Sequence, residues 1–125
     1  MPHLLQKTSL IAMRKRREFL IVRDQGVKQV TPFFILQACR TRADGPPHFG
    51  ITASKKTGNA VRRNRARRRM RALLREIVLQ EAHEGHDYSL VARYDLADAP
   101  WEVLCDEMKR ALVKLHKKTE KAGSQ

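Results

Sequence analysis

The sequence of 125 residues has little of what defines several protein classes. It contains two cysteines, Cys39 and Cys105, which are far apart and match no metal-binding spacing. They are typical of thiols in a reducing compartment, with a disulfide as the alternative. No run approaches the roughly 20 apolar residues of a membrane span. The first residues also lack the apolar region and cleavage site of a signal peptide. These absences predict a cytoplasmic protein with no membrane partner.

Acidic residues are missing from one long stretch of the chain. Residues 55–75 hold two lysines and eight arginines, which supply +10 of the formal net charge of +13. Aromatic residues are also scarce, at 6% of the sequence, so each one is a candidate for a specific role. Positive charge that is concentrated in one segment favours a polyanion, such as a nucleic acid, as the partner.

The pattern of apolar and turn-forming residues predicts one α+β domain that spans residues 1–125. We expect helices over residues 14–25, 59–81 and from about residue 98 onward, and strands over residues 27–30, 33–39, 48–54 and 88–94. Residues 1–13 are expected to be a loosely ordered lead-in, and residues 117–125 a frayed polar tail. The predicted order is αβββαβα, with a mixed sheet of four strands packed against the helices.

The basic segment has the spacing of an amphipathic helix. Apolar residues recur at three- and four-residue steps from Ala66 through Met70 to Ile77, and arginines occupy the rest of the circumference. An ordinary solvent-exposed face is the alternative interpretation. However, cations in a first helical turn oppose the helix dipole, at about 0.3–1 kcal/mol each. The neighbouring arginines also lack acids at i+4 that would relieve their repulsion. The pattern therefore favours a folded helix that binds an anion.

No arrangement in the sequence predicts a protein active site. The stretch from Gly50 to Thr57 has a glycine, a lysine and a hydroxyl, but it lacks the glycine before the lysine that a P-loop requires. Residues 81–87 contain two histidines and three acids, which we interpret as a flexible loop, with a metal site as the alternative. We therefore expect no catalytic residues and no metal ligands in the protein.

Residues 51–68 closely resemble the signature of the bacterial ribonuclease P protein family. The matching string reads Ser-Lys-Lys, then Gly-Asn-Ala-Val, one variable residue and Arg-Asn-Arg, followed by a basic helix. Further similarity lies at residues 17–19, 32–34 and 87–93, so that the resemblance covers roughly residues 13–115.

This resemblance implies a fold and a function. Members of the family have the αβββαβα order with a left-handed βαβ crossover. They form a one-to-one particle with a catalytic RNA that removes the 5′ leader of precursor tRNA. In that particle the RNA carries the active site and its Mg²⁺ ions. The protein binds the RNA through its basic helix and the leader in a cleft between the sheet and the first helix. We expect the protein alone to be a monomer.

The resemblance also assigns roles to individual residues. Residues expected to bind the RNA subunit are Lys55, Lys56, Arg62, Arg63, Asn64, Arg65, Arg67, Arg68 and Arg71. Phe19, Phe34 and Lys56 are expected in the leader cleft, with a place in the core as the alternative for both phenylalanines. Arg23 and Gln37 stand where many members have aromatic residues, which predicts a cleft that relies less on stacking and more on charge. A non-catalytic RNA-binding protein, such as a ribosomal protein, is the alternative function.

Overall fold

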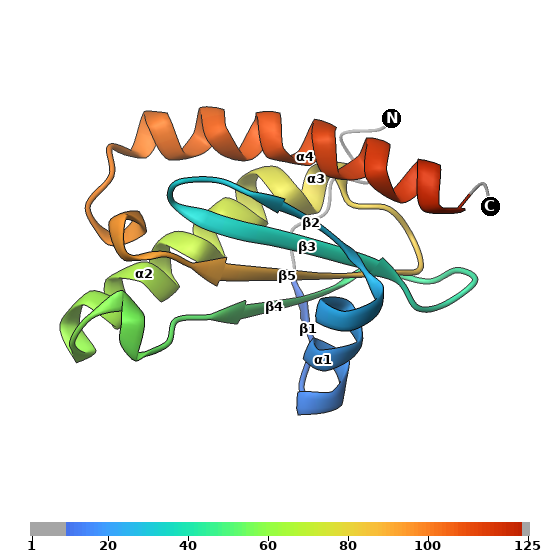
Figure 1. Cartoon of the computed structure of the whole chain (residues 1–125), viewed down its shortest axis with the longest axis horizontal. Helices are drawn as coiled ribbons and strands as arrows, with labels where there is room; N and C mark the ends of the chain where they lie inside the picture. Colours follow the sequence, from blue (N-terminus) through green and yellow to red (C-terminus); the bar gives the residue numbers. More distant parts are fainter. Residues whose placement is uncertain (1–9, 124–125) are drawn as a thin grey trace.

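The computed structural model describes residues 10–123 and contains one mixed sheet with helices on both of its faces (Figure 1). The strands are β1 (Ile11–Ala12), β2 (Val27–Val30), β3 (Phe34–Arg40), β4 (His48–Thr52) and β5 (His86–Ala92). The main helices are α1 (Arg16–Gln25), α2 (Ala60–Leu73) and α4 (Trp101–Gly123). A π-helical segment, η3 (Leu74–Val78), and the short α3 (Leu79–Glu81) continue α2 without a break. Two 3-10 turns, η2 (Lys55–Thr57) and η4 (Tyr94–Ala97), precede α2 and α4.

The strand order is β1-β4-β5-β3-β2. The pairs β1–β4 and β4–β5 are parallel, whereas β5–β3 and β3–β2 are antiparallel. The α+β class, the mixed sheet and the order of the main elements confirm the prediction from the sequence. The sheet has five strands rather than four, because Ile11 and Ala12 pair with His48 and Phe49. A strand of two residues has no sequence period of its own, so only the pairing with β4 defines it.

Both ends of the chain differ from the expected lead-in and tail. The lead-in expected over residues 1–13 contains β1, and the N–H of Met13 donates to the carbonyl of Phe49 at 2.7 Å. The tail expected to fray over residues 117–125 is helical through Gly123, because the apolar side of α4 continues to dock as far as Leu115. Residues 1–9 and 124–125 lie outside the described part of the chain.

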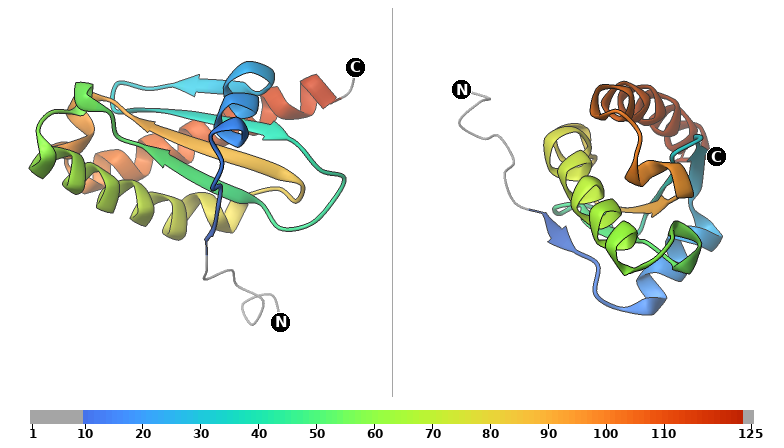
Figure 2. Two further views of the ribbon diagram at one scale, coloured as in Figure 1. Left: turned by 90° about the horizontal axis from the view of Figure 1, so that it is seen from below. Right: turned by 90° about the vertical axis from the view of Figure 1, so that its left-hand side faces the viewer.

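The two faces of the sheet are covered differently. The larger core lies between the sheet and the helices α2 and α4, and includes the fully buried Phe34, Leu36 and Leu90. On the other face α1 crosses the strands and packs Val22 against Met13 and Cys39 (Figure 2). Because side chains alternate along a strand, the even-numbered residues of β3 face α4 and the odd-numbered residues face α1. The α1 face has a smaller core, which leaves part of the sheet accessible.

Local signals in the sequence explain where α1 begins and ends. The Glu18 carboxylate accepts hydrogen bonds from the amides of Lys15, at 2.9 Å, and Arg14, at 3.2 Å. These bonds, the Lys15 amide first, lower the pKa of Glu18. At the other end, the N–H of Gly26 donates to the carbonyl of Val22 at 3.0 Å. A Cβ at residue 26 would lie 2.3 Å from the carbonyl oxygen of Ala38, so this position requires glycine.

The two cysteines are free thiols, as the sequence predicts. Cys39 is buried on β3, and Cys105 is half-buried on α4. Burial raises the pKa of both thiols, so neither has the lowered pKa of a reactive cysteine.

Candidate nucleic-acid interface

The apolar stripe of α2 determines which arginines face the solvent. Ala66, Met70 and Leu73 are fully buried against the core, which fixes the rotation of the helix about its axis. The helix begins at the predicted position, because the Asn59 side chain accepts a hydrogen bond from the amide of Arg62 at 3.0 Å. Its exposed polar residues, together with the two lysines of η2, are Lys55, Lys56, Asn64, Arg65, Arg68 and Arg71. We call these six residues the basic face.

Arg62, expected to bind RNA, is held instead by contacts within the protein. Its guanidinium forms an ion pair with Asp98 and donates to the carbonyl of Tyr94 at 2.6 Å and to that of Thr57 at 3.1 Å. It also lies 4.0 Å from the centre of the Tyr94 ring, as a cation–π contact. The hydrogen bond to Asp98 raises the pKa of Arg62 and lowers that of Asp98. These contacts fasten the start of α2 to η4.

The other residues of the Arg-Asn-Arg motif differ in how free they are. The Arg65 guanidinium lies 3.3 Å from Asp98 but keeps about half of its side chain exposed. Asn64 is exposed, and its side-chain oxygen accepts a hydrogen bond from Arg67 at 3.0 Å. Arg63 is half-buried, and its Nε is buried without a hydrogen-bond partner among the described residues. The predicted contact residues therefore share one end of α2, but Asp98 already neutralises part of their charge.

Asp98 has a role that the local sequence does not indicate. Its position before Pro100 suggests the N-cap of the last helix. In the structure that helix begins at Trp101, the carbonyl of Pro100 accepts the first helical hydrogen bond from Leu104, and the Asp98 carboxylate faces α2. The acid that relieves the repulsion in the first turn of α2 thus comes from a loop more than 30 residues away.

Arg69 is also bound within the protein. One of its terminal nitrogens donates to the carbonyl of Leu96 at 3.0 Å and to that of Ala99 at 2.6 Å. Its neighbour Arg68 is exposed, with no hydrogen bond or ion pair among the described residues. Adjacent arginines on one helix thus have opposite surroundings, because only one of them points toward the loop that leads into α4.

A groove of about 630 Å³ lies between α1 and the sheet. Arg14, Arg16 and Arg23 line it from α1 and the segment before it, together with Phe19. The strands contribute Ile35, Gln37, Thr52, Ser89 and Val91. Basic side chains beside a partly apolar floor form a surface that suits a single-stranded nucleic acid.

The structure separates the three residues expected in the leader cleft. Phe34 does not line the groove: it is 0% exposed and belongs to the core on the opposite face of the sheet. The groove instead has Ile35 and Gln37 from the same strand, because successive side chains alternate between faces. Lys56 is exposed on η2 and is not among the residues that line this groove.

Phe19 lines the groove and also packs on the sheet. A Cβ at residue 50 would lie 2.3 Å from the Phe19 ring, so the absence of a side chain at Gly50 makes room for it. The ring is half-buried beside the small cluster of Met13, Val22 and Cys39. Both interpretations of Phe19 from the sequence therefore hold in part.

The three arginines of the groove were missed by reasoning from the sequence. A signal was present, since residues 14–17 read Arg-Lys-Arg-Arg without an acid between them. This run is shorter than the basic segment of α2, and nothing in the local sequence shows that it borders a groove. Its position becomes clear only when α1 is placed across the sheet (Figure 2).

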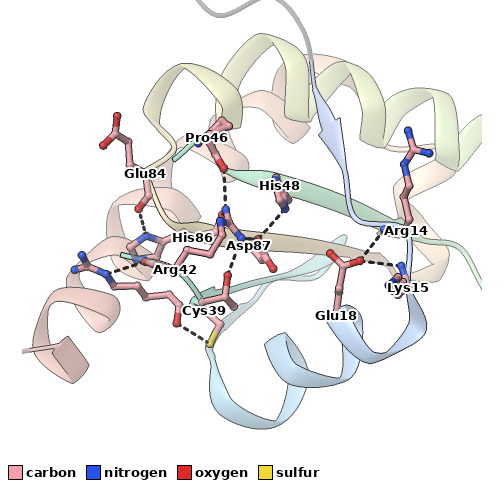
Figure 3. Close-up of polar contacts among 12 residues, drawn as sticks. Arg14, Lys15, Glu18, Cys39, Arg42, Pro46, His48, Glu84, His86 and Asp87 are labelled. Carbon is pink, nitrogen blue, oxygen red and sulfur yellow. Dashed lines mark hydrogen bonds and ion pairs between the residues drawn. The ribbon is translucent and has the colours of Figure 1, made fainter. Parts of the chain in front are cut away.

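One group of side chains has the spacing of metal ligands. Ligand atoms of Glu18, His48 and Asp87 all lie within 4.8 Å of one another. Both acids, however, already have partners (Figure 3). Asp87 forms an ion pair with Arg42 at 2.7 Å, and Arg42 also donates to the carbonyl of Pro46 at 2.7 Å. Glu18 holds the start of α1, so the known contacts explain the group without a metal.

The histidines near residues 81–87 take part in a cluster of rings. His83 stacks on His116 of α4 with 3.8 Å between ring centres. The Tyr88 hydroxyl lies 2.8 Å from Nε2 of His116 and accepts a hydrogen bond from the His83 amide at 2.9 Å. Burial and the nearby His83 lower the pKa of His116 to about 4, and burial raises that of Tyr88 to about 12. Together with the bond from His86 to the carbonyl of Glu84, these contacts give the histidines a structural role.

Within residues 10–123, no helix is both long enough and apolar enough to cross a membrane.

Comparisons with known proteins agree with this arrangement. The family model described as Ribonuclease P matches residues 9–116. The ribonuclease P protein component of Caulobacter vibrioides is 36% identical over 98% of this chain and 80% of its own length. That of Ruegeria pomeroyi is 39% identical over 87% of this chain and 89% of its own.

Solved structures show the same fold. The RNase P protein of Staphylococcus aureus has a TM-score of 0.64, with 23% identity, over 87% of this chain and 94% of its own. The RNase P protein from Thermotoga maritima has a TM-score of 0.65, with 23% identity, over 86% and 96%. The family match over most of the sequence and the identity to curated relatives place this chain in the ribonuclease P protein family.

Proposed function

We propose that the protein binds the catalytic RNA of ribonuclease P through the basic face and holds the 5′ leader of precursor tRNA in the groove beside α1. Its role is to assist the endonucleolytic removal of the leader, which gives the mature 5′ end of the tRNA. The observation that carries this proposal is the division of α2 into a buried apolar stripe and an exposed row that includes Asn64, Arg65, Arg68 and Arg71.

The basic face is suited to a phosphate backbone. Guanidinium groups bind phosphate oxygens in a bidentate manner, and several of them along one helix can follow successive phosphates. Lys55 and Lys56 extend the positive surface beyond the start of α2. Arg62 contributes by fixing the start of the helix rather than by direct contact, because its donors are already occupied.

The groove is suited to one strand of nucleic acid. Its arginines can bind the backbone of the leader, and the floor between Ile35 and Val91 offers apolar surface to the bases. Stacking is limited, since Phe19 is the one aromatic side chain among the described residues that line the groove. We therefore infer that charge supplies most of the affinity for the leader.

We infer that the RNA subunit carries out catalysis with Mg²⁺ bound mainly by that RNA. The group formed by Glu18, His48 and Asp87 does not fit a Mg²⁺ site, because Mg²⁺ prefers oxygen ligands and Arg42 already occupies Asp87. The protein alone is proposed to be a cytoplasmic monomer.

Reconstitution with a bacterial ribonuclease P RNA tests this proposal. At low Mg²⁺ we expect faster leader removal with the protein than with the RNA alone. A matched reaction with Arg65→Ala should show weaker binding of the RNA, because one exposed guanidinium is lost. Equal rates with and without the wild-type protein would refute the proposal and favour a non-catalytic RNA-binding protein.

A further inference from the structure

The floor of the groove contains a row of four residues that lie side by side across the sheet. Gly50 of β4 pairs with Ser89 of β5, Ser89 pairs with Gln37 of β3, and Gln37 pairs with Lys28 of β2. Paired residues of adjacent strands point to the same face. Ser89 and Gln37 therefore lie next to each other on the α1 face, near the middle of the sheet.

These two side chains have unused hydrogen-bonding groups. Gln37 is half-buried, and its amide has no hydrogen-bond partner among the described residues. Ser89 is 3% exposed, and its hydroxyl also has no described partner, although it lines the groove. A half-buried amide without a partner loses hydration and gains nothing in return. Its cost is offset if a ligand with a complementary edge enters the groove.

The surroundings of Gln37 favour a nucleobase as that ligand. The next row of the floor is apolar, because Ile35 pairs with Val91 on the same face. On the other side Phe19 covers Gly50, so its ring is partly engaged in packing on the sheet. A planar base could therefore rest on the apolar row and direct its polar edge at the amide, while the arginines of the groove hold the flanking phosphates.

We propose that Gln37, assisted by Ser89, recognises the edge of one leader base by hydrogen bonds and so makes leader binding depend on the identity of that base. This inference rests on the proposed function of the groove. In single-stranded nucleic acid the base edges are free to be read. An amide presents a donor and an acceptor side by side, and it distinguishes bases by the order of these groups along their edges. Arginines that bind phosphates give no such distinction.

The expected size of the effect follows from the energy of a hydrogen bond. A net contribution of about 0.5–1.5 kcal/mol per bond corresponds to roughly 3- to 10-fold in affinity. A base that leaves the amide unpaired loses this factor, whereas changes at other leader positions should have smaller effects.

Binding of precursor tRNA to the reconstituted holoenzyme, with each of the four bases placed in turn at every leader position, tests the inference. We expect one position at which affinity varies by about 3- to 10-fold among the bases. In Gln37→Ala this variation should disappear, and Ser89→Ala should reduce it. Gln37→Phe should restore affinity by stacking without restoring the dependence on the base. Gln29→Ala is the matched control, since Gln29 pairs with Leu36 and lies on the opposite face.

The outcomes separate this inference from the function on which it rests. Equal affinity for all four bases at every position, or a dependence that persists in Gln37→Ala, overturns the inference alone. If precursor and mature tRNA bind equally well, the proposed role of the groove in holding the leader fails as well.

Discussion

Arg68 and Arg69 allow the binding and structural roles of α2 to be tested separately. They are adjacent and carry the same charge, but only Arg69 donates to protein carbonyls, those of Leu96 and Ala99. Arg68→Ala should therefore weaken RNA binding and leave the free energy of unfolding almost unchanged. Arg69→Ala should lower the free energy of unfolding by about 1.5–3 kcal/mol, the typical contribution of hydrogen bonds to charged groups.

The salt dependence of RNA binding gives the magnitude for Arg68. Each phosphate contact contributes about 0.7–0.9 to the slope of log affinity against log salt. Between 50 and 200 mM salt, one lost contact means that the affinity of Arg68→Ala falls about three-fold less than that of the wild type. Filter binding to the ribonuclease P RNA at constant Mg²⁺ measures the slope, and chemical denaturation measures the stability of each variant.

Two results would refute this reasoning. An unchanged slope for Arg68→Ala would mean that its guanidinium does not contact a phosphate. A stability of Arg69→Ala equal to that of the wild type would mean that its two hydrogen bonds do not hold the loop before α4. Arg71→Ala, another exposed position on the same helix, is the control and should behave like Arg68→Ala.

Three further predictions follow from burial, ionisation and charge. Phe34→Ala should lower the free energy of unfolding by about 3–5 kcal/mol in chemical denaturation, since Phe34 is fully buried. Phe19→Ala should instead reduce the preference for precursor over mature tRNA, and an equal loss for both tRNAs would indicate damaged folding. The pKa of His116 is about 4 in the folded protein, below the ordinary 6.5. The unfolded chain therefore binds more protons, and stability present above pH 6.5 is lost as the pH falls toward 4. The loss should be about 1–2 kcal/mol after allowance for partial exposure, and His116→Gln should remove it; a pH dependence equal to that of the wild type would contradict this. Asp98→Asn removes a negative charge beside the basic face and should increase RNA affinity at low salt; unchanged affinity in filter binding would contradict this.

Most of the fold could be predicted because its signals are local. The period of Ala66, Met70 and Leu73 defines the buried side of α2, and Asn59 marks the start of that helix. Gly26 ends α1 as predicted. The strand β1 could not be predicted, because two residues carry no period and pair only with β4. The helical conformation of residues 117–123 was also missed, since their polar composition suggested a frayed end.

The candidate site was predicted in its position but only partly in its members. The ordered motif around Asn64 identified the family and the basic helix from the sequence alone. It could not show that Arg62 pairs with Asp98, because that contact joins residues more than 30 positions apart. Alternation along β3 showed that neighbouring residues face opposite sides, but not which side each helix would cover. That choice depends on packing, which placed Phe34 in the core and Gln37 in the groove.

The sequence by itself therefore determined the class of partner, the order of the elements and the side of α2 that carries charge. These properties depend on composition and on periods that short segments contain. Only the tertiary structure decided which arginines are free and which are bound, and which face of the sheet forms the groove. These depend on contacts between distant segments, whose geometry exists only once the core has packed.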